Sequence, residues 1–362
     1  MRIAILGTRG VPNNHGGFEQ FAEYFSKYLA ENGHDVYVFN SHNHPYQEKT
    51  WNGVKILHEY DPEYKIGTAG QFIYDLNCIL TCRKENFDII LQLGYTSSSI
   101  WSFMFPKTSV IVTNMDGLEW KRSKYSKKTR FFLKRAELWG AKYSDFLISD
   151  SIGIQNYLQK TYNKTSEFIA YGAKVFNNPN EAILLEYNLT KHNYSMLIAR
   201  MEPENNIETI LDGFHNSKSA TPFLVIGKIN KFGSYLKEKY KTDSRIKFLG
   251  AIYNQNHLDN LRYYSRYYCH GHSVGGTNPS LLEAMASKSL IIAHDNIFNK
   301  SILNKECKYF HKAGDLQVIF DDDSYFVRKE DFCYLNIEKI NTKYSWDIIN
   351  KQYESYLLKT IK

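Results

Sequence analysis

Short apolar runs alternate with helix-length segments along the whole chain. In the first half, runs rich in aliphatic and aromatic residues lie at 2–7, 35–39, 54–58, 88–91, 109–113, 145–149 and 167–171. A second series lies at 196–199, 222–226, 246–249, 267–270, 290–293 and 309–311. Strands that alternate with helices at this spacing are typical of a parallel sheet with helices on both faces. The pattern therefore predicts an α/β fold with two such sheets.

The segment between the first two runs has one apolar face, as an amphipathic helix has. Its apolar residues recur at helical spacing: Phe18, Phe21, Ala22, Phe25 and Leu29. Asn32 and Gly33 mark its end. Near the C-terminus, Ser345 can cap a further amphipathic helix whose apolar side begins with Trp346.

A turn-forming stretch separates the two series of runs. Residues 177–180 read Asn-Asn-Pro-Asn, and both residue types favour turns. We therefore predict an N-terminal Rossmann-like domain at 1–185, a second Rossmann-like domain at 186–344, and a C-terminal helix at 345–362 that packs back on the first domain. A length of 362 residues agrees with two cores of roughly 150–200 residues each.

Composition predicts a folded protein that stays inside the cell. Apolar residues make up 43% of the chain, well above the share in a disordered protein. No apolar run approaches the roughly 18–20 residues that span a bilayer, and the first run is too short for a signal peptide. We expect a cytoplasmic protein.

Cysteines and acidic motifs do not support a metal site. The five cysteines contain no CxxC pair, so neither a disulfide framework nor a zinc site is expected. The one DxD match, at residues 321–323, lies late in the chain, and we interpret it as a solvated acidic turn. We therefore expect no metal and no other cofactor.

A basic stretch occupies residues 121–135. It contains eight Lys and Arg residues, Lys124 among them, no acid, and several apolar anchors. Each Lys or Arg near an anionic membrane contributes roughly 1 kcal/mol of attraction, so this stretch could hold the protein at a lipid surface. The alternative is an exposed helix whose charges are simply solvated. Nucleic acid is not an expected partner, because the stretch is single and has no recognition motif.

The turn after the first run is rich in glycine. Residues 7–19 connect a predicted strand with a predicted helix and contain Gly16 and Gly17. Free N–H groups at a helix start attract anions, and glycine lets a phosphate approach closely. The spacing matches neither a dinucleotide GxGxxG motif nor a Walker motif. A flexible connecting loop is the equally valid alternative.

A second glycine-rich turn lies at residues 270–286. Asn278 can cap a helix that begins with a proline, so the turn from Gly276 through Thr277 to Ser280 forms a further anion-binding helix start. Glu283, one turn into this helix, can accept hydrogen bonds from the hydroxyls of a bound ligand.

Two histidines and an arginine complete the candidate residues. His270 closes a predicted strand and His272 follows in the turn, but no third metal ligand accompanies them. Taken singly, each histidine is more often structural than catalytic, and His272 is the one of the two that could contact a ligand. Arg200 follows the first run of the second half and can pair with phosphate oxygens, although an arginine in a solvated loop is the commoner explanation.

Together these segments resemble glycosyltransferase family 4, which has the GT-B fold of two facing Rossmann-like domains, and more closely its rhamnosyltransferase-like branch. The matching segments are Gly16-Gly17, 114–120, 199–206, 272–286 and 344–346. The resemblance implies that the domain at 1–185 is the acceptor side and that the domain at 186–344 binds the nucleotide sugar. It also implies that the Gly16-Gly17 loop faces the diphosphate of the donor, that Arg200 binds this diphosphate, and that Glu283 holds the ribose.

The sequence departs from the family pattern at three positions. Asn205 stands where the family has a lysine, and Lys228 or Lys231 could replace that charge. Gly275 stands where the family has a glutamate that contacts the transferred sugar, which a 6-deoxy sugar or a sugar held differently could explain. Asp116 stands where many members have an active-site histidine. It could accept the proton of the acceptor hydroxyl or stabilise charge at the sugar ring, or it could simply bond to its own loop.

The resemblance implies a retaining glycosyltransferase of the hexosyltransferase class in bacterial cell-surface polysaccharide synthesis. The donor is a nucleotide-diphospho-sugar, with L-rhamnose as the sugar of the nearest branch, and the acceptor is a lipid-linked or other saccharide. Such an enzyme would be peripheral at the inner face of the plasma membrane. Two alternatives stay open: a sugar-nucleotide epimerase of the same fold, and a non-catalytic polysaccharide-assembly protein.

Overall fold

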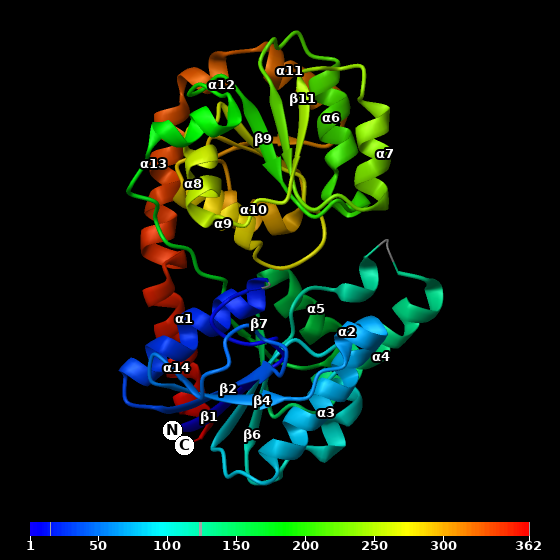
Figure 1. Cartoon of the computed structure of the whole chain (residues 1–362), viewed down its shortest axis with the longest axis vertical. Helices are drawn as coiled ribbons and strands as arrows, with labels where there is room; N and C mark the ends of the chain where they lie inside the picture. The colour runs from blue at the N-terminus through cyan, green and yellow to red at the C-terminus, as the bar shows by residue number, and fades with distance from the viewer. Residues whose placement is uncertain (15, 123–124, 362) are drawn as a thin grey trace. The chain divides into compact units, whose positions relative to one another are not determined.

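The computed structural model describes residues 1–14, 16–122 and 125–361 (Figure 1). It consists of two compact units. Unit 1 contains the described residues within Met1–Lys121, Tyr125–Tyr171 and Trp346–Lys362, and unit 2 contains those within Arg122–Lys124 and Gly172–Ser345.

The chain passes from unit 1 to unit 2 between Tyr171 and Ala173. The Tyr171 hydroxyl donates to the carbonyl of Gly17 in unit 1 at 2.9 Å, whereas the Ala173 N–H donates to the carbonyl of Tyr344 in unit 2 at 2.7 Å. The predicted boundary near residue 185 is therefore displaced. The turn-forming residues 177–180 that suggested it belong to unit 2, where they cap a short helix.

Unit 1 is built on a mostly parallel sheet. Its described residues form eight strands in the order β3-β4-β2-β1-β5-β6-β7-β8, and only β3 runs antiparallel. The strands are β1 (Arg2–Leu6), β2 (Asp35–Ser41), β3 (Thr50–Trp51), β4 (Val54–Glu59), β5 (Ile89–Leu93), β6 (Val110–Asn114), β7 (Phe146–Ser149) and β8 (Glu167–Phe168). The seven runs predicted in this half all form strands, and the short β3 is the strand that the pattern did not predict.

Helices cover the sheet of unit 1 and explain its continuous apolar strands. They are α1 (Gly17–Glu31), α2 (Glu63–Ile66), α3 (Gly70–Cys82), α4 (Lys127–Tyr143), α5 (Ile152–Tyr162) and α14 (Trp346–Thr360), with short 3-10 helices η2 (Ser99–Met104) and η3 (Glu119–Lys121) among the connections. The C-terminal helix α14 packs on α1 through aromatic rings. Tyr24 stacks on Trp346 with centroids 4.5 Å apart, and Phe21 lies 4.6 Å from Tyr353.

Unit 2 is a second α/β unit with a fully parallel sheet. Its described strands have the order β11-β10-β9-β12-β13-β14. They are β9 (Ser195–Ile198), β10 (Phe223–Ile226), β11 (Ile246–Gly250), β12 (Tyr267–His270), β13 (Ile291–His294) and β14 (Lys308–Phe310). The main helices around them are α6 (Ile207–His215), α7 (Lys231–Lys239), α8 (Gln255–Tyr263), α9 (Pro279–Ala286), α10 (Ile297–Leu303), α11 (Ala313–Asp321) and α13 (Lys329–Lys339). The α/β fold with two parallel-rich sheets is thus confirmed.

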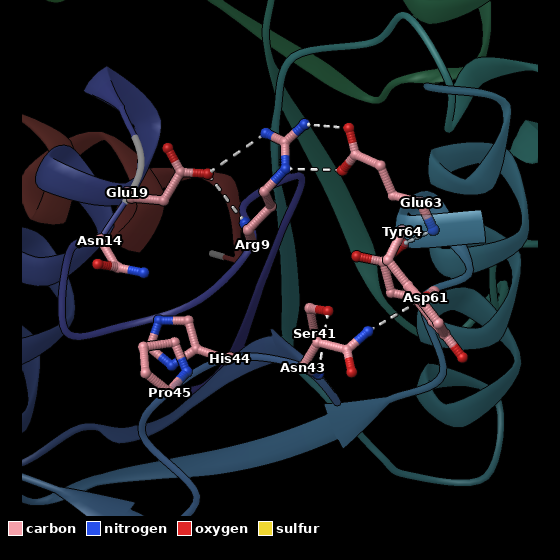
Figure 2. A pocket seen from close by; sticks show the side chains of 10 residues that line it. All are labelled: Arg9, Asn14, Glu19, Ser41, Asn43, His44, Pro45, Asp61, Glu63 and Tyr64. Carbon is pink, nitrogen blue, oxygen red and sulfur yellow. Dashed lines mark hydrogen bonds and ion pairs between the residues drawn. The ribbon is translucent and has the colours of Figure 1, made fainter. Parts of the chain in front are cut away.

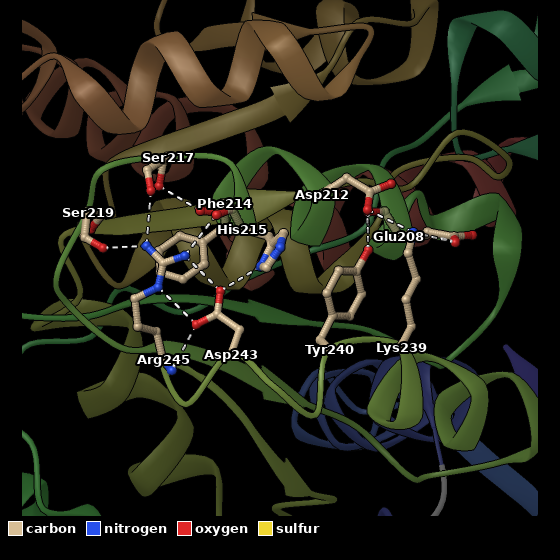
Figure 3. Close-up of polar contacts among 10 residues, drawn as sticks. All are labelled: Glu208, Asp212, Phe214, His215, Ser217, Ser219, Lys239, Tyr240, Asp243 and Arg245. Carbon is tan, nitrogen blue, oxygen red and sulfur yellow. Dashed lines mark hydrogen bonds and ion pairs between the residues drawn. The ribbon is translucent and has the colours of Figure 1, made fainter.

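Polar clusters stabilise unit 2 at the edge where β10 and β11 begin (Figure 3). The Arg245 guanidinium donates to both oxygens of Asp243, at 2.9 and 2.7 Å, and to the carbonyls of His215, Ser217 and Ser219. These hydrogen bonds from Arg245 lower the pKa of Asp243. The polar network that fixes the connection between α6 and β10 therefore lies away from the carboxyl edge of the sheet.

None of the described helices is long and apolar enough to cross a membrane. All five cysteines are buried and unpaired. Among the described residues, no three His, Cys, Asp or Glu side chains are grouped so that they could hold a metal ion. In the predicted acidic turn, Asp321 accepts the N–H of Lys218 at 2.6 Å and Asp323 pairs with Arg266.

Candidate functional site

The candidate site of unit 2 lies where its strand order changes direction. β9 is the first strand of the unit, and it lies between β10 on one side and β12 on the other. The chain leaves β9 towards β10 and leaves β12 towards β13, so the two connections diverge at the carboxyl edge. Open α/β sheets bind ligands at this position. The loops that form it are residues 199–206 and 271–278, two of the segments singled out in the sequence.

The two loops are joined by direct contacts. The N–H and the hydroxyl of Ser273 both donate to the carbonyl of Glu204, at 3.1 and 2.7 Å. The Asn206 amide donates to the carbonyl of Gly271 at 2.8 Å. A Cβ atom on Gly271 would lie only 2.0 Å from the carbonyl oxygen of Asn205, so the approach requires glycine. The structure therefore holds Arg200 and the Gly276–Ser280 turn on neighbouring loops.

Arg200 is an exposed cation at this edge. Its guanidinium makes no hydrogen bond or ion pair with any described residue. Its carbonyl accepts the side-chain amide of Asn205 at 2.8 Å. Asn205 is only 5% exposed, and its amide is used to hold the loop. Asn205 thus acts as a support for the loop of Arg200, although its position predicts contact with the donor.

Two lysines follow the next strand along the sheet, Lys228 on the loop and Lys231 as the first residue of α7. Lys228 and Lys231 follow β10, are both exposed and have no ion-pair partner among the described residues. The Asn230 amide between them donates to the carbonyl of Met201 at 2.8 Å, which ties their loop to that of Arg200. The segments after β9 and β10 therefore carry three exposed cations that have no ion-pair partner among the described residues, while Glu202 and Glu204 lie on the same loop as Arg200.

The start of α9 is built as the sequence predicts for an anion-binding turn. Asn278 caps the helix by accepting the N–H of Ser280 at 2.9 Å, and Pro279 is its first residue. Gly275 has a φ of +133°, a conformation that side chains rarely adopt. The N–H groups of Gly275 and Gly276 have no partner among the described residues. Thr277 is buried here, and a shallow hollow beside the turn is lined by His272, Val274, Gly275, Gly276, Asn278, Phe298 and Asn299.

Glu283 is held by a buried arginine that the sequence analysis missed. Arg262 is 1% exposed, and its guanidinium donates to Glu283 Oε2 at 2.5 Å and to Asp259 Oδ1 at 3.1 Å. Glu283 Oε1 has no hydrogen-bond partner among the described residues. The Ser280 hydroxyl, by contrast, is engaged with the hydroxyl of Tyr268 at 2.6 Å. One oxygen of Glu283 therefore stays available on a fixed carboxylate.

His270 and His272 form a neutral stacked pair. Their ring centroids are 4.5 Å apart, with 16° between the planes. Burial lowers the pKa of both rings, that of His272 to about 3, and Arg200 adds to the effect on His272. Both nitrogens of His270 and the Nδ1 of His272 are buried and have no hydrogen-bond partner in the described ranges of the chain. Neither ring carries charge near neutral pH, so His272 can serve a ligand only as a neutral hydrogen-bonding group.

The first glycine-rich loop, in unit 1, differs from a free phosphate loop. The Arg9 N–H donates to Glu19 at 3.0 Å, the Val11 N–H donates to Asn40 at 3.0 Å, and the Asn13 N–H donates to Glu23. These three N–H groups, which we predicted to be available to an anion, thus already donate hydrogen bonds to side chains of the protein. Gly16 caps α1 without a side-chain hydrogen bond, so the helix start at Gly16-Gly17 is what remains for the predicted role.

Asp116 follows β6 in unit 1 with a φ of +43°. Its N–H donates to Asn114 Oδ1 at 3.0 Å, and the Asn114 amide donates to the Tyr353 hydroxyl at 2.8 Å. Asp is among the residues that tolerate this left-handed conformation. The backbone of Asp116 is therefore fixed by its own loop, and the side chain is partly buried.

A buried carboxylate near Asp116 has no counterpart in the sequence analysis. Glu137 on α4 is 1% exposed and accepts hydrogen bonds from Tyr157 at 2.6 Å, Tyr162 at 2.5 Å, Trp120 at 3.0 Å and Tyr95 at 3.3 Å. Burial and the bond to Glu137 raise the pKa of Tyr157 to about 12. The signal that could have revealed it is a glutamate on the apolar side of an otherwise basic amphipathic helix.

Comparison with known proteins connects these observations to a fold family. Residues 1–174 match a family described as a domain of unknown function (DUF1972). No curated protein sequence matches the chain. Among solved structures, sucrose-phosphate synthase from Thermosynechococcus elongatus has 16% identity and a TM-score of 0.77, covering 99% of this chain and 98% of that one.

Two further structures show the same similarity along the whole chain. HepE from Anabaena, solved in complex with UDP, has 13% identity and a TM-score of 0.74 over 99% of this chain and 100% of that one. A glycosyltransferase from Rickettsia africae has 12% identity and a TM-score of 0.69 over 100% and 99%. At these identities the similarity is one of fold. The chain has the GT-B fold, with its two Rossmann-like units.

Proposed function

We propose that the protein is a glycosyltransferase whose donor is a nucleotide-diphospho-sugar bound by unit 2. One observation carries the proposal: the unpaired guanidinium of Arg200 lies on a loop joined to the N–H groups of Gly275 and Gly276, at the edge where this fold binds ligands. An arginine and helix-start N–H groups stabilise charge on a departing diphosphate. We propose that no metal is needed for this step.

The ribose of the donor is proposed to bind at Glu283. Its free Oε1 can accept a hydroxyl hydrogen, and the ion pair with Arg262 prevents the carboxylate from turning away. Neutral His272 and the backbone around Thr277 and Asn278 complete the proposed donor site. Lys228 and Lys231 could supply the charge that the family pattern places at position 205, because both follow the neighbouring strand β10 and have no ion-pair partner among the described residues.

The transferred sugar is proposed to be L-rhamnose or a related 6-deoxy hexose, transferred with retention. Support comes from the hollow beside the α9 turn, where Gly275 replaces a carboxylate and Val274 and Phe298 offer apolar surface to a methyl group. Asp116 in unit 1 is the proposed catalytic carboxylate, accepting the acceptor proton or stabilising positive charge at the ring. Gly16 and Gly17 are proposed to contact the donor diphosphate from unit 1.

The acceptor is proposed to be a lipid-linked saccharide reached at the cytoplasmic face of the plasma membrane. The surface of α4 supports this proposal: Lys127, Lys128, Lys134 and Arg135 are exposed, and Phe131 beside them is 65% exposed. Within the predicted basic stretch 121–135, Ser123 and Lys124 lie outside the described residues. Liposomes of anionic lipid should bind the protein, and neutralising these four cations to glutamine should abolish that binding.

Calorimetry with dTDP, UDP and GDP on the full chain tests the donor assignment. At least one of them should bind, and Arg200→Ala should weaken binding about 10- to 150-fold, because a charge-assisted hydrogen bond contributes about 1.5–3 kcal/mol. Lys218→Ala is the matched control, because this exposed cation lies at the other edge of the same sheet. Absence of nucleotide binding, or equal effects of the two substitutions, would contradict the proposal.

Turnover assays separate the proposal from its two alternatives. A glycosyltransferase releases nucleoside diphosphate only when an acceptor receives the sugar. An epimerase would convert the donor with no acceptor present. Nucleotide binding without any turnover, across a panel of lipid-linked acceptors, would favour a non-catalytic assembly protein.

A further inference from the structure

Unit 1 contains a polar cavity that none of the assignments above uses (Figure 2). Its volume is about 220 Å³, and it lies at the carboxyl edge of the sheet. Its walls come from the loops after β1, β2 and β4 and from the first turn of α1. Parallel sheets of this kind bind ligands at the carboxyl ends of their strands, so the position is that of a binding site.

The single arginine in this cavity is already neutralised. Arg9 donates through Nε and Nη2 to the two oxygens of Glu63, each at 2.9 Å, in a bidentate pair. Glu19 and Asp61 also line the cavity, so three carboxylates surround one guanidinium and leave an excess of two negative charges. Burial lowers the pKa of His44 in the wall, so this ring adds no positive charge near neutral pH.

Two largely buried carboxylate side chains in the wall each have one oxygen without a partner among the described residues. Glu19 and Asp61 are each 5% exposed. One oxygen of Glu19 accepts the Arg9 N–H at 3.0 Å, and one oxygen of Asp61 accepts the Glu63 N–H at 2.9 Å. Glu19 Oε2 and Asp61 Oδ2 have no hydrogen-bond partner among the described residues. Both carboxylates line the cavity, so these two oxygens can accept hydrogen bonds from a ligand that brings O–H or N–H groups.

An aromatic side chain lies at the same cavity. Tyr64 lines it and is 61% exposed, and the His42 ring lies 5.9 Å from the Tyr64 ring. A ring held beside polar acceptors offers an apolar face to the C–H groups of a ligand while the acceptors take its hydroxyls. The combination matches a molecule that has many hydroxyl groups and one apolar face.

We propose that this cavity binds the sugar ring of the acceptor, and that this ring carries no negative charge. Glu19 and Asp61 accept its hydroxyl hydrogens, and Tyr64 packs against its C–H face. A neutral or amino sugar fits the excess negative charge, whereas a uronic acid or a sugar phosphate is repelled by it. The inference rests on the proposed function, and it places any diphosphate of a lipid-linked acceptor outside the cavity.

Saturation-transfer NMR and calorimetry on the full chain test this assignment. The probes are methyl glycosides of neutral hexoses, with glucuronic acid and glucose 6-phosphate as anionic counterparts. At least one neutral glycoside should bind, and the anionic probes should bind at least about tenfold more weakly, which corresponds to about 1.4 kcal/mol. Equal or tighter binding of the anionic probes would overturn the proposal.

Substitutions locate the binding. Asp61→Asn and Glu19→Gln keep the shape of each side chain and should weaken the binding of the neutral glycoside about tenfold. Tyr64→Ala is an exposed change that the fold tolerates, and it should weaken binding as well. Asp35→Asn is the matched control, because this aspartate begins β2 at the other edge of the same sheet. If the control weakens binding as much as the other three, the site is elsewhere.

Nucleotide titrations on the same samples keep this inference distinct from the proposed function. Normal nucleotide binding without any glycoside binding would overturn the proposed acceptor site but would still agree with the proposed glycosyltransferase function. Glycoside binding that depends on Asp61, without any nucleotide binding, would support a saccharide site in a protein that is not a transferase. Thermal unfolding of each variant shows whether a loss of binding reflects loss of the fold.

Discussion

Gly271→Ala is the substitution that tests most directly how the proposed donor site of unit 2 is held together. The new Cβ would lie 2.0 Å from the Asn205 carbonyl oxygen, whereas an ordinary contact needs at least 3.4 Å. The two loops must separate by more than 1 Å, which stretches the hydrogen bonds that Ser273 and Asn206 make across them. Overpacking costs about 1–3 kcal/mol, and stretching these hydrogen bonds costs about as much as losing one of them, about 0.5–1.5 kcal/mol, so we expect a loss of about 2–4 kcal/mol.

Two measurements report the effect of Gly271→Ala. For a unit of this size, thermal unfolding should shift down by about 4–16 °C. Calorimetry should show the Kd of the nucleoside diphosphate raised at least about tenfold, because Arg200 moves away from the α9 turn.

Gly314→Ala provides the control for this prediction. Gly314 lies in α11, and a Cβ there would meet no atom within 4 Å. Alanine in place of glycine within a helix should leave stability unchanged or raise it by about 0.5–1 kcal/mol. If Gly271→Ala and Gly314→Ala unfold at the same temperature and bind nucleotide equally, the close contact between the two loops does not exist.

Three further substitutions test buried polar groups. Arg262→Met leaves two carboxylates without their cation, and urea denaturation should show the free energy of unfolding lowered by about 3–5 kcal/mol. Arg266→Met is the control: it breaks a pair with an exposed carboxylate and should lower the free energy of unfolding by less than about 1 kcal/mol. Arg245 lowers the folded-state pKa of Asp243. Wild type should therefore be more stable than Asp243→Asn at neutral pH, and this difference in the free energy of unfolding should shrink as the pH falls below about 4. A difference that grows in acid would contradict the lowered pKa. Glu137→Gln replaces one of the two acceptor oxygens by a donor and should lower the free energy of unfolding by at least about 1.5 kcal/mol, and an unchanged urea midpoint would show that the buried carboxylate is not needed.

The fold was predictable from sequence because each buried strand is a short apolar run bounded by turns. All thirteen predicted runs form strands. The antiparallel β3 is two residues long and carries no periodic signal. The boundary near residue 185 was misplaced because turn residues mark any surface turn, and those at 177–180 begin a helix inside unit 2. Sequence composition does not distinguish such a turn from a linker.

The candidate loops were predictable for a different reason. A glycine-rich turn between a strand and a helix is a local feature, and the carboxyl edge follows from the order of the elements. The partners of the functional side chains are not local. Arg262 meets Glu283 from 21 positions away, and Glu137 takes its donors from residues 17 to 42 positions away. Such pairs depend on packing between elements, which no spacing along the chain encodes.

Electrostatics gives the two units opposite chemical preferences. At the carboxyl edge of unit 2, Arg200, Lys228 and Lys231 have no ion-pair partner within the described part of the chain, and the N–H groups of Gly275 and Gly276 have no acceptor there. In the cavity of unit 1, Arg9 is held by Glu63 and carboxylates are in excess. Positive potential favours an anionic diphosphate, and negative potential favours an uncharged ligand that donates hydrogen bonds. If the proposed donor and acceptor sites are correct, each substrate would be repelled or left without partners at the other's site, and the same charges would prevent their exchange.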